Sequence, residues 1–160
     1  MKEKENVVDI TELTEQFSKE LHITKQKTST ILKEYINICR ENLTKGIPVI
    51  IPNVCIIYDK EYQNELYFTN GFLVYEISQR LHYPYIMVES VINKMFRLII
   101  QYVTIEQKPI ILRNLFKLYS TVNENGSISL HIAKTTALKN TNVMVHTCKW
   151  MKQEVNSNAR

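Results

Sequence analysis

Apolar residues recur at helical spacing in two long stretches of the chain, and a run rich in β-branched residues follows each stretch. In the first stretch the spacing predicts a helix that ends near Leu21 and a longer helix over about 25–45. Thr24 stands where its side chain can cap the longer helix at its amino end. The run that follows, over 47–58, is typical of a β-strand.

The same order of elements is predicted again about 60 residues later. The residues Thr69-Asn70-Gly71 indicate a turn before a first helix, and Pro84 suits the first turn of a second helix over about 85–105. A second β-branched run follows at 108–119. Beyond it, Asn125-Gly126 indicates a hairpin leading to a strand at about 127–133, and residues 142–154 read as a final helix.

Individual residues repeat as well, and their spacing points to an internal duplication. Apolar matches arise easily by chance, but matching proline, asparagine, tyrosine and Leu-His at nearly one offset is much rarer. We therefore interpret the chain as two tandem units of an α+β fold, residues 1–68 and 69–156. At an offset of 61 the matched residues are Pro48, Asn53 and Tyr58 with Pro109, Asn114 and Tyr119, and at an offset of 60 they are Leu21-His22 with Leu81-His82.

The repeated polar and aromatic residues carry structural expectations of their own. The two asparagines interrupt the β-branched runs and are expected in a left-handed conformation at a bulge or tight bend. His22 and His82 fall between the two helices of each unit, where a shared role such as helix capping is expected. Tyr58 and Tyr119 are expected to pack across strands, although stacking on nucleic-acid bases is an alternative.

Composition and charge narrow the classes of function. The hydrophobic fraction of 44% is ordinary for a globular protein. The formal charge is −2 over residues 1–70 and +6 over residues 71–160, so any attraction to phosphate is expected from the second half. A solvated surface without a ligand explains the same asymmetry.

No arrangement of residues predicts catalysis, a metal site or a cofactor. The three cysteines, Cys39, Cys55 and Cys148, fit neither zinc nor redox spacing, and we expect reduced thiols with the first two in the core. The four histidines lack metal-ligand spacing, and with three glycines the chain has no phosphate-binding glycine loop. The charged amino terminus and the short apolar runs predict a soluble intracellular protein without a membrane span.

The order helix–helix–strand–strand–strand–helix, with a short first and a long second helix, resembles the HU/IHF family of DNA-architecture proteins. The stretch Lys134-Thr-Thr-Ala-Leu-Lys139 resembles the segment that follows the β-arm in that family. The resemblance implies two HU/IHF-like units that form within one chain the intertwined dimer of the family. It also implies basic β-arms that enter the minor groove and bend the duplex.

Two features depart from the family pattern. The glycine-rich turn of the family is replaced by Pro52-Asn53 and Arg113-Asn114, and the β-arms are short. Residues 59–65 are net acidic and residues 120–127 contain no lysine or arginine, so neither arm supplies the cations that bind phosphate. If DNA is bound, the expected residues are Arg113, Lys117, Lys134, Lys139, Lys149 and Lys152, although a solvated surface cation is the favoured interpretation of each.

Two functions follow as hypotheses. The favoured one is a non-enzymatic assembly protein, a ring or neck type component of a tailed-phage virion that binds other copies of itself or other phage proteins. Short strand edges near 59–68 are candidate pairing sites for such partners. The alternative is a histone-like, nucleoid-associated protein of the cytoplasm that binds double-stranded DNA without sequence preference.

Overall fold

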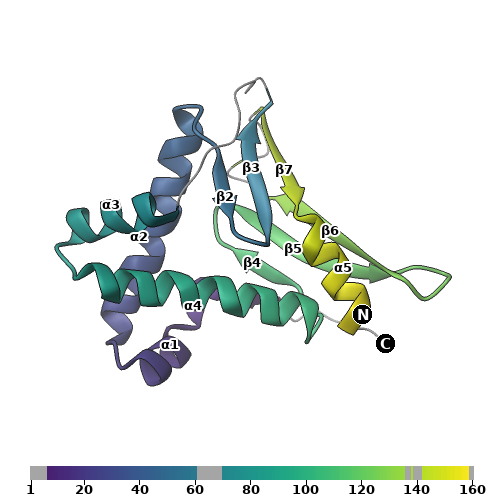
Figure 1. Cartoon of the computed structure of the whole chain (residues 1–160), viewed down its shortest axis with the longest axis horizontal. Coiled ribbons are helices and arrows are strands. Elements are labelled where there is room, and N and C mark those ends of the chain that lie inside the picture. Colours follow the sequence, from purple (N-terminus) through teal and green to yellow (C-terminus); the bar gives the residue numbers. More distant parts are fainter. Residues whose placement is uncertain (1–6, 61–69, 136–137, 139–141, 159–160) are drawn as a thin grey trace, which may run out of the picture.

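A computed structural model describes residues 7–60, 70–135, 138 and 142–158 of the chain. In these residues the protein is a mixed α+β fold with five α-helices and two β-sheets (Figure 1). The first half contains β1 (Val8–Asp9), a 3-10 turn (Ile10–Glu12), α1 (Thr14–Leu21), α2 (Lys25–Thr44), β2 (Val49–Ile51) and β3 (Cys55–Asp59). The second half contains α3 (Asn70–Leu81), α4 (Tyr85–Thr104), β4 (Ile110–Leu112), β5 (Phe116–Val122), β6 (Ile128–Lys134), β7 (Val143–Thr147) and α5 (Lys149–Asn158).

The two halves repeat the same local structure at the offsets expected from the sequence. Helices α2 and α4 begin and end 60 residues apart, and β2 and β4 begin and end 61 residues apart. His22 and His82 both follow the last residue of a helix with left-handed φ values of 56° and 55°, which confirms their shared structural position. Asn53 and Asn114 are also left-handed, with φ values of 61° and 68°, as expected.

Each β-branched run is a hairpin rather than the single strand predicted. The amide of Val54 donates to the carbonyl of Ile51, and the amide of Leu115 donates to that of Leu112, so a tight turn separates two short strands in each copy. The left-handed asparagine is the third residue of each turn, where its conformation reverses the chain. Each hairpin therefore places two antiparallel strands beside the long helix that precedes it.

Two other local predictions need correction. Helix α3 already begins at Asn70, so Asn70-Gly71 starts the helix instead of forming a turn before it. The first part of the predicted final helix is strand β7, and the helix begins only at Lys149. The side chains of Val143 and Val145 lie on the inner face of this strand, where backbone pairing with β3 favours the extended conformation.

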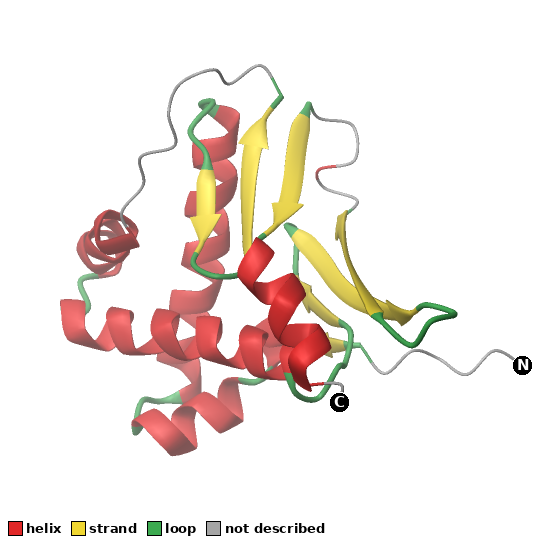
Figure 2. Cartoon of the chain, turned by 45° about the vertical axis from the view of Figure 1, so that its right-hand side comes forward, coloured by secondary structure: helices red, strands yellow, loops and turns green. Residues whose placement is uncertain are grey.

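The sheets are completed by segments from the opposite half of the chain. One sheet has the order β2-β3-β7, so its third strand comes from beyond the second unit's hairpin. The other has the order β1-β4-β5-β6, in which β1 from the start of the chain pairs in parallel with β4. Figure 2 shows both sheets toward one side of the molecule and α1 to α4 toward the other, with α5 packed against both α4 and β6. The predicted ranges 1–68 and 69–156 thus share both sheets.

The buried side chains form one hydrophobic core that draws on both halves. Helices α2 and α4 contribute more buried residues than any other element, and the rings of Tyr35 and Phe96 meet edge to face with centroids 5.9 Å apart. Phe17 from α1 and Ile77 from α3 are both fully buried in the same cluster. None of the described helices is long and apolar enough to cross a membrane.

Candidate functional site

Arg113, the first of the predicted DNA-binding residues, is held in ion pairs. It lies in the turn between β4 and β5, and its guanidinium contacts the carboxylates of Asp9 and Glu12 at 2.9 Å. The Nε of Arg113 also donates to Asp9 at 3.1 Å. The guanidinium thus ties the second unit's hairpin to the start of the first unit, and its charge is neutralised locally.

The other predicted cations that the structure describes lie on β5, β6 and α5. In the β5–β6 register Lys117 is opposite Ala133 and Lys134 is opposite Phe116, so the two lysines extend from opposite faces of the hairpin. Lys149 and Lys152 lie three residues apart on α5, and both are exposed. Lys139 lies outside the described residues. The structure therefore brings Lys149 and Lys152 onto one helix but does not gather the predicted set into one basic face.

The outer faces of the two sheets carry matching pairs of stacked rings. Tyr119 on β5 stacks on His131 of β6, with centroids 5.1 Å apart and an interplanar angle of 22°. Its counterpart Tyr58 on β3 stacks on His146 of β7 at 5.6 Å and 19°. The amine of Lys117 lies 5.4 Å from the centre of the Tyr119 ring. The expectation that both tyrosines pack across strands is confirmed.

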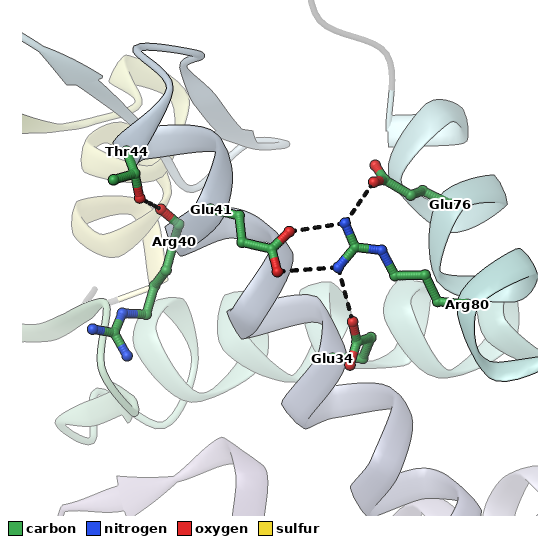
Figure 3. A network of polar contacts seen from close by, with 6 residues as sticks. All are labelled: Glu34, Arg40, Glu41, Thr44, Glu76 and Arg80. Carbon is green, nitrogen blue, oxygen red and sulfur yellow. Dashed lines mark hydrogen bonds and ion pairs between the residues drawn. The ribbon is translucent and has the colours of Figure 1, made fainter.

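A network of ion pairs joins helix α3 of the second unit to helix α2 of the first (Figure 3). The guanidinium of Arg80 contacts Glu41 through both of its terminal nitrogens, at 2.8 and 3.2 Å. It also donates to Glu34 at 3.2 Å and to Glu76 at 2.8 Å. The hydrogen bonds from Arg80 lower the pKa of the Glu41 carboxyl, and those carboxylates in turn raise the pKa of Arg80.

The reciprocal contact, between α1 of the first unit and α4 of the second, is the ion pair of Glu20 and Lys94. The hydrogen bond from Lys94 lowers the pKa of Glu20. At the offset of 60, Glu20 corresponds to Arg80 and Glu34 corresponds to Lys94. Each contact between the units therefore contains an ion pair at the same two repeat positions. The first unit supplies the acidic member and the second unit the basic member in both contacts.

An open polar cleft of about 700 Å³ lies between the carboxyl half of α2 and the start of β7. Its polar lining includes Glu34, Asn37, Arg40, Glu41, Asp59 and Asn142. Figure 3 shows the side chain of Arg40 extending away from Arg80, while Glu34 and Glu41 are turned toward Arg80. The described lining contains no serine, cysteine or histidine, and the hydroxyl of Thr44 donates to the backbone carbonyl of Arg40 at 2.7 Å.

Two of the three thiols are also poor candidates for chemistry. Cys39 and Cys55 are buried, and burial raises the pKa of Cys39 to about 12 and that of Cys55 further still. Their place in the core agrees with the expectation from the sequence. Over the described ranges, no group of three or more His, Cys, Asp or Glu residues is placed to hold a metal ion.

Searches of protein-family models, curated proteins and solved structures found no match to this chain. The candidate surfaces therefore rest on the geometry of the chain itself. The two units can, however, be compared with each other position by position.

That comparison identifies an apolar surface that the sequence analysis missed. Four large side chains on α3 and the first turn of α4 are exposed, and we call them the α3–α4 patch. Their exposed fractions are 65% for Phe72, 55% for Tyr75, 41% for Tyr85 and 72% for Ile86. Figure 1 places these elements at the opposite end of the molecule from the β5–β6 hairpin.

The corresponding positions of the first unit are polar. At the offset of 60 they are Glu12, Glu15, Lys25 and Gln26. Glu15 and Lys25 form an exposed ion pair at 3.3 Å, so the positions of their counterparts Tyr75 and Tyr85 are adjacent in the repeated geometry. Aligning the polar positions of the two copies, and not only the apolar ones, would have revealed this patch from the sequence.

Proposed function

We propose that this protein is a non-enzymatic assembly protein, a ring or neck type structural component of a phage virion built on a degenerate HU/IHF-like fold. The observation that carries the proposal is the α3–α4 patch. Large exposed apolar side chains on one face indicate a protein-binding surface when they are not needed for the fold. The polar counterparts in the first unit indicate that the helix pair does not require them.

The pairing of the two units supports the HU/IHF-like part of the proposal. Helix α1 packs on α2 and α4, and α3 packs on α4 and α2, so each short helix contacts the long helix of both units. Such an exchange is what the family resemblance implies for two units that dimerise within one chain. On this proposal the short β5–β6 hairpin corresponds to an arm of the family.

The charges of the described surface favour assembly over DNA bending. The turn of the β5–β6 hairpin consists of Asn123, Glu124, Asn125 and Gly126, with Val122 exposed before it. This tip carries no cation, and Arg113 is already paired with two carboxylates. Because phosphate affinity comes from lysine and arginine, the tip of this hairpin lacks the cations with which an arm holds a duplex.

DNA binding stays as a second candidate because of the outer face of the β5–β6 hairpin. Lys117, Tyr119 and His131 lie together on that face, where a cation and stacked rings meet solvent. The exposed lysines of α5 add further positive charge. On this hypothesis the protein is nucleoid-associated, whereas the assembly role implies a virion component built in the host cytoplasm.

Sedimentation velocity of the pure protein, with and without a duplex of about 30 base pairs, separates the two functions. The assembly role predicts association of the protein alone and no complex with the duplex at about 50 or 200 mM salt. DNA binding predicts a complex whose affinity falls steeply between those salt concentrations. A salt-sensitive complex with a monomeric protein would reject the assembly role. A protein that neither associates with itself nor binds the duplex would reject DNA binding and restrict the assembly role to contacts with other phage proteins.

A further inference from the structure

We infer that the α3–α4 patch is a self-association surface, on which a second copy of this chain docks about a two-fold axis. The inference rests on the proposed assembly function, because both take the patch as a protein-binding surface, and it adds the partner and the symmetry. A two-fold contact closes a dimer, so a ring built from such dimers uses a second surface as well. The patch consists of Phe72, Tyr75, Tyr85 and Ile86.

The patch is dispensable for the internal packing of the chain. Helix α3 packs into the core through Leu73, Val74 and Ile77, which are buried, and Phe72 and Tyr75 extend from its other side. In the first unit the equivalent helix pair carries an ion pair at the positions of the two tyrosines. Because these positions are polar in the first unit and apolar in the second, the fold that the two units share does not require apolar side chains there. We therefore assign the patch a role in binding another molecule.

The chemistry of the α3–α4 patch is compatible with the same patch on a second copy of the chain. All four side chains are uncharged, so pairing the surface with itself buries no unpaired charge. A tyrosine hydroxyl both donates and accepts hydrogen bonds, so each tyrosine can bond to its own counterpart across a two-fold axis. A nucleic acid, by contrast, requires cations that the four residues lack.

The exposed area is also on the scale that a dimer requires. Taking about 200 Å² for a whole aromatic side chain, the exposed parts of the four residues amount to roughly 450 Å². A stable interface of standard size takes about 800 Å² from each partner. The patch therefore supplies more than half of one partner's share before any polar rim is added.

The faces through which the units pair are not open to another chain. The inner sides of α2 and α4 are buried in the common core, and the ion pairs of Arg80 and Lys94 close the contacts with α3 and α1. A second copy can use the patch without opening these contacts. Association through the patch is thus compatible with the fold as it stands.

The test is sedimentation equilibrium of the full chain, comparing the wild type with the double variant Tyr75→Glu/Tyr85→Lys. This variant installs the ion pair that the first unit already holds at the same positions, so we expect it to fold and to melt near the wild type. We expect a wild-type dimer and a dissociation constant at least about tenfold higher in the variant. Ile86→Ala, which adds no charge, should weaken the dimer in the same direction.

Val122→Glu is the matched control, because Val122 is 74% exposed but lies on the distant β5–β6 hairpin. It should leave the dimer intact. A wild-type protein that stays monomeric at its highest soluble concentration, or a dimer unchanged in the patch variants, would overturn the inference. A larger ring that persists in the patch variants would overturn it and leave the assembly role standing. A dimer lost in the variants, in a protein that also binds DNA in a salt-sensitive manner, would support the inference and reject that role.

Discussion

Glu20 of α1 forms an ion pair with Lys94 of α4, across the contact between the two units. The reciprocal contact, between α3 and α2, contains the ion pair of Arg80 and Glu34. Arg80 matches Glu20 and Glu34 matches Lys94 at the offset of 60 residues, so the two ion pairs use the same positions with opposite charges. The first unit is therefore acidic at both positions and the second unit is basic at both. Two first units or two second units would bring like charges together, so the arrangement favours pairing of one unit with the other.

Reversing one member of this pair should destabilise the fold, and reversing both should restore stability. Lys94→Glu places two carboxylates in contact, so we expect a lower melting temperature than in the wild type. In Glu20→Lys/Lys94→Glu the attraction returns and most of the loss should disappear. Thermal unfolding followed by circular dichroism measures both effects. Lys33→Glu, an equal change of charge at an exposed position of α2, is the control. Additive losses in the double variant would contradict the coupling.

The ion-paired carboxylates of Glu20 and Glu41 should make the stability of the fold sensitive to acid. Lys94 lowers the pKa of Glu20 and Arg80 lowers that of Glu41, relative to the ordinary value of 4.5. Because the unfolded chain binds protons more readily, the stabilisation is present above that value and is lost as pH falls through the lowered pKa values of the folded protein. Urea unfolding between about pH 5 and pH 3 should show the midpoint falling.

Arg80→Gln should make this dependence on pH shallower, because Glu41 then has no guanidinium to lower its pKa. The same experiment on Lys33→Gln, which also removes one positive charge at an exposed position, controls for the change in net charge. If the urea midpoint of Arg80→Gln changes with pH as steeply as that of the wild type, the network does not contribute to the loss of stability in acid.

Because one core serves both units, damage in the first unit should unfold the second. Phe17→Ala removes a fully buried ring from α1, at a cost of about 3–5 kcal/mol in the free energy of unfolding. The single tryptophan, Trp150, lies on α5 near the other end of the chain and reports on it by fluorescence. We expect fluorescence and circular dichroism to give the same lowered midpoint. Val122→Ala, at an exposed position of the β5–β6 hairpin, should change the free energy of unfolding by about 0.5 kcal/mol or less.

Separate transitions by the two probes in Phe17→Ala would mean that the units unfold independently. Such a result would conflict with the sharing of sheets and core between them.

The three thiols should differ sharply in reactivity. Burial keeps Cys39 and Cys55 protonated and out of contact with solvent, whereas Cys148 is partly exposed. Alkylation at about pH 8 with mass detection should therefore modify Cys148 first in the folded protein, and all three thiols only after denaturation. Cys148→Ser should leave the folded protein without rapid labelling. Rapid labelling of Cys39 in that variant would contradict the packing of α2.

The sequence predicted features that depend on neighbouring residues. Both long helices were expected with carboxyl ends one residue beyond those observed, because apolar spacing and the Thr24 cap act within a few turns. The left-handed asparagines and the hairpin at Asn125-Gly126 also follow from local backbone preferences.

Segments whose partners lie far along the chain were predicted less well. Residues 143–147 carry apolar side chains at spacings that fit a helix or a strand, and only the open edge of β3 decides for the strand. Arg113 reads as a free surface cation until β1 and the following turn bring Asp9 and Glu12 beside it. The α3–α4 patch was within reach of the sequence, but its exposure became clear only when the helices were packed.

The sequence by itself thus determined the order of the helices, their repetition and the turns between them, because these depend on contacts within a few residues. The tertiary structure alone decided which strand completes which sheet, which charges are neutralised and which aromatic side chains stay in solvent. Those outcomes depend on residues that are distant in the chain and become neighbours only when the two units pack around one core.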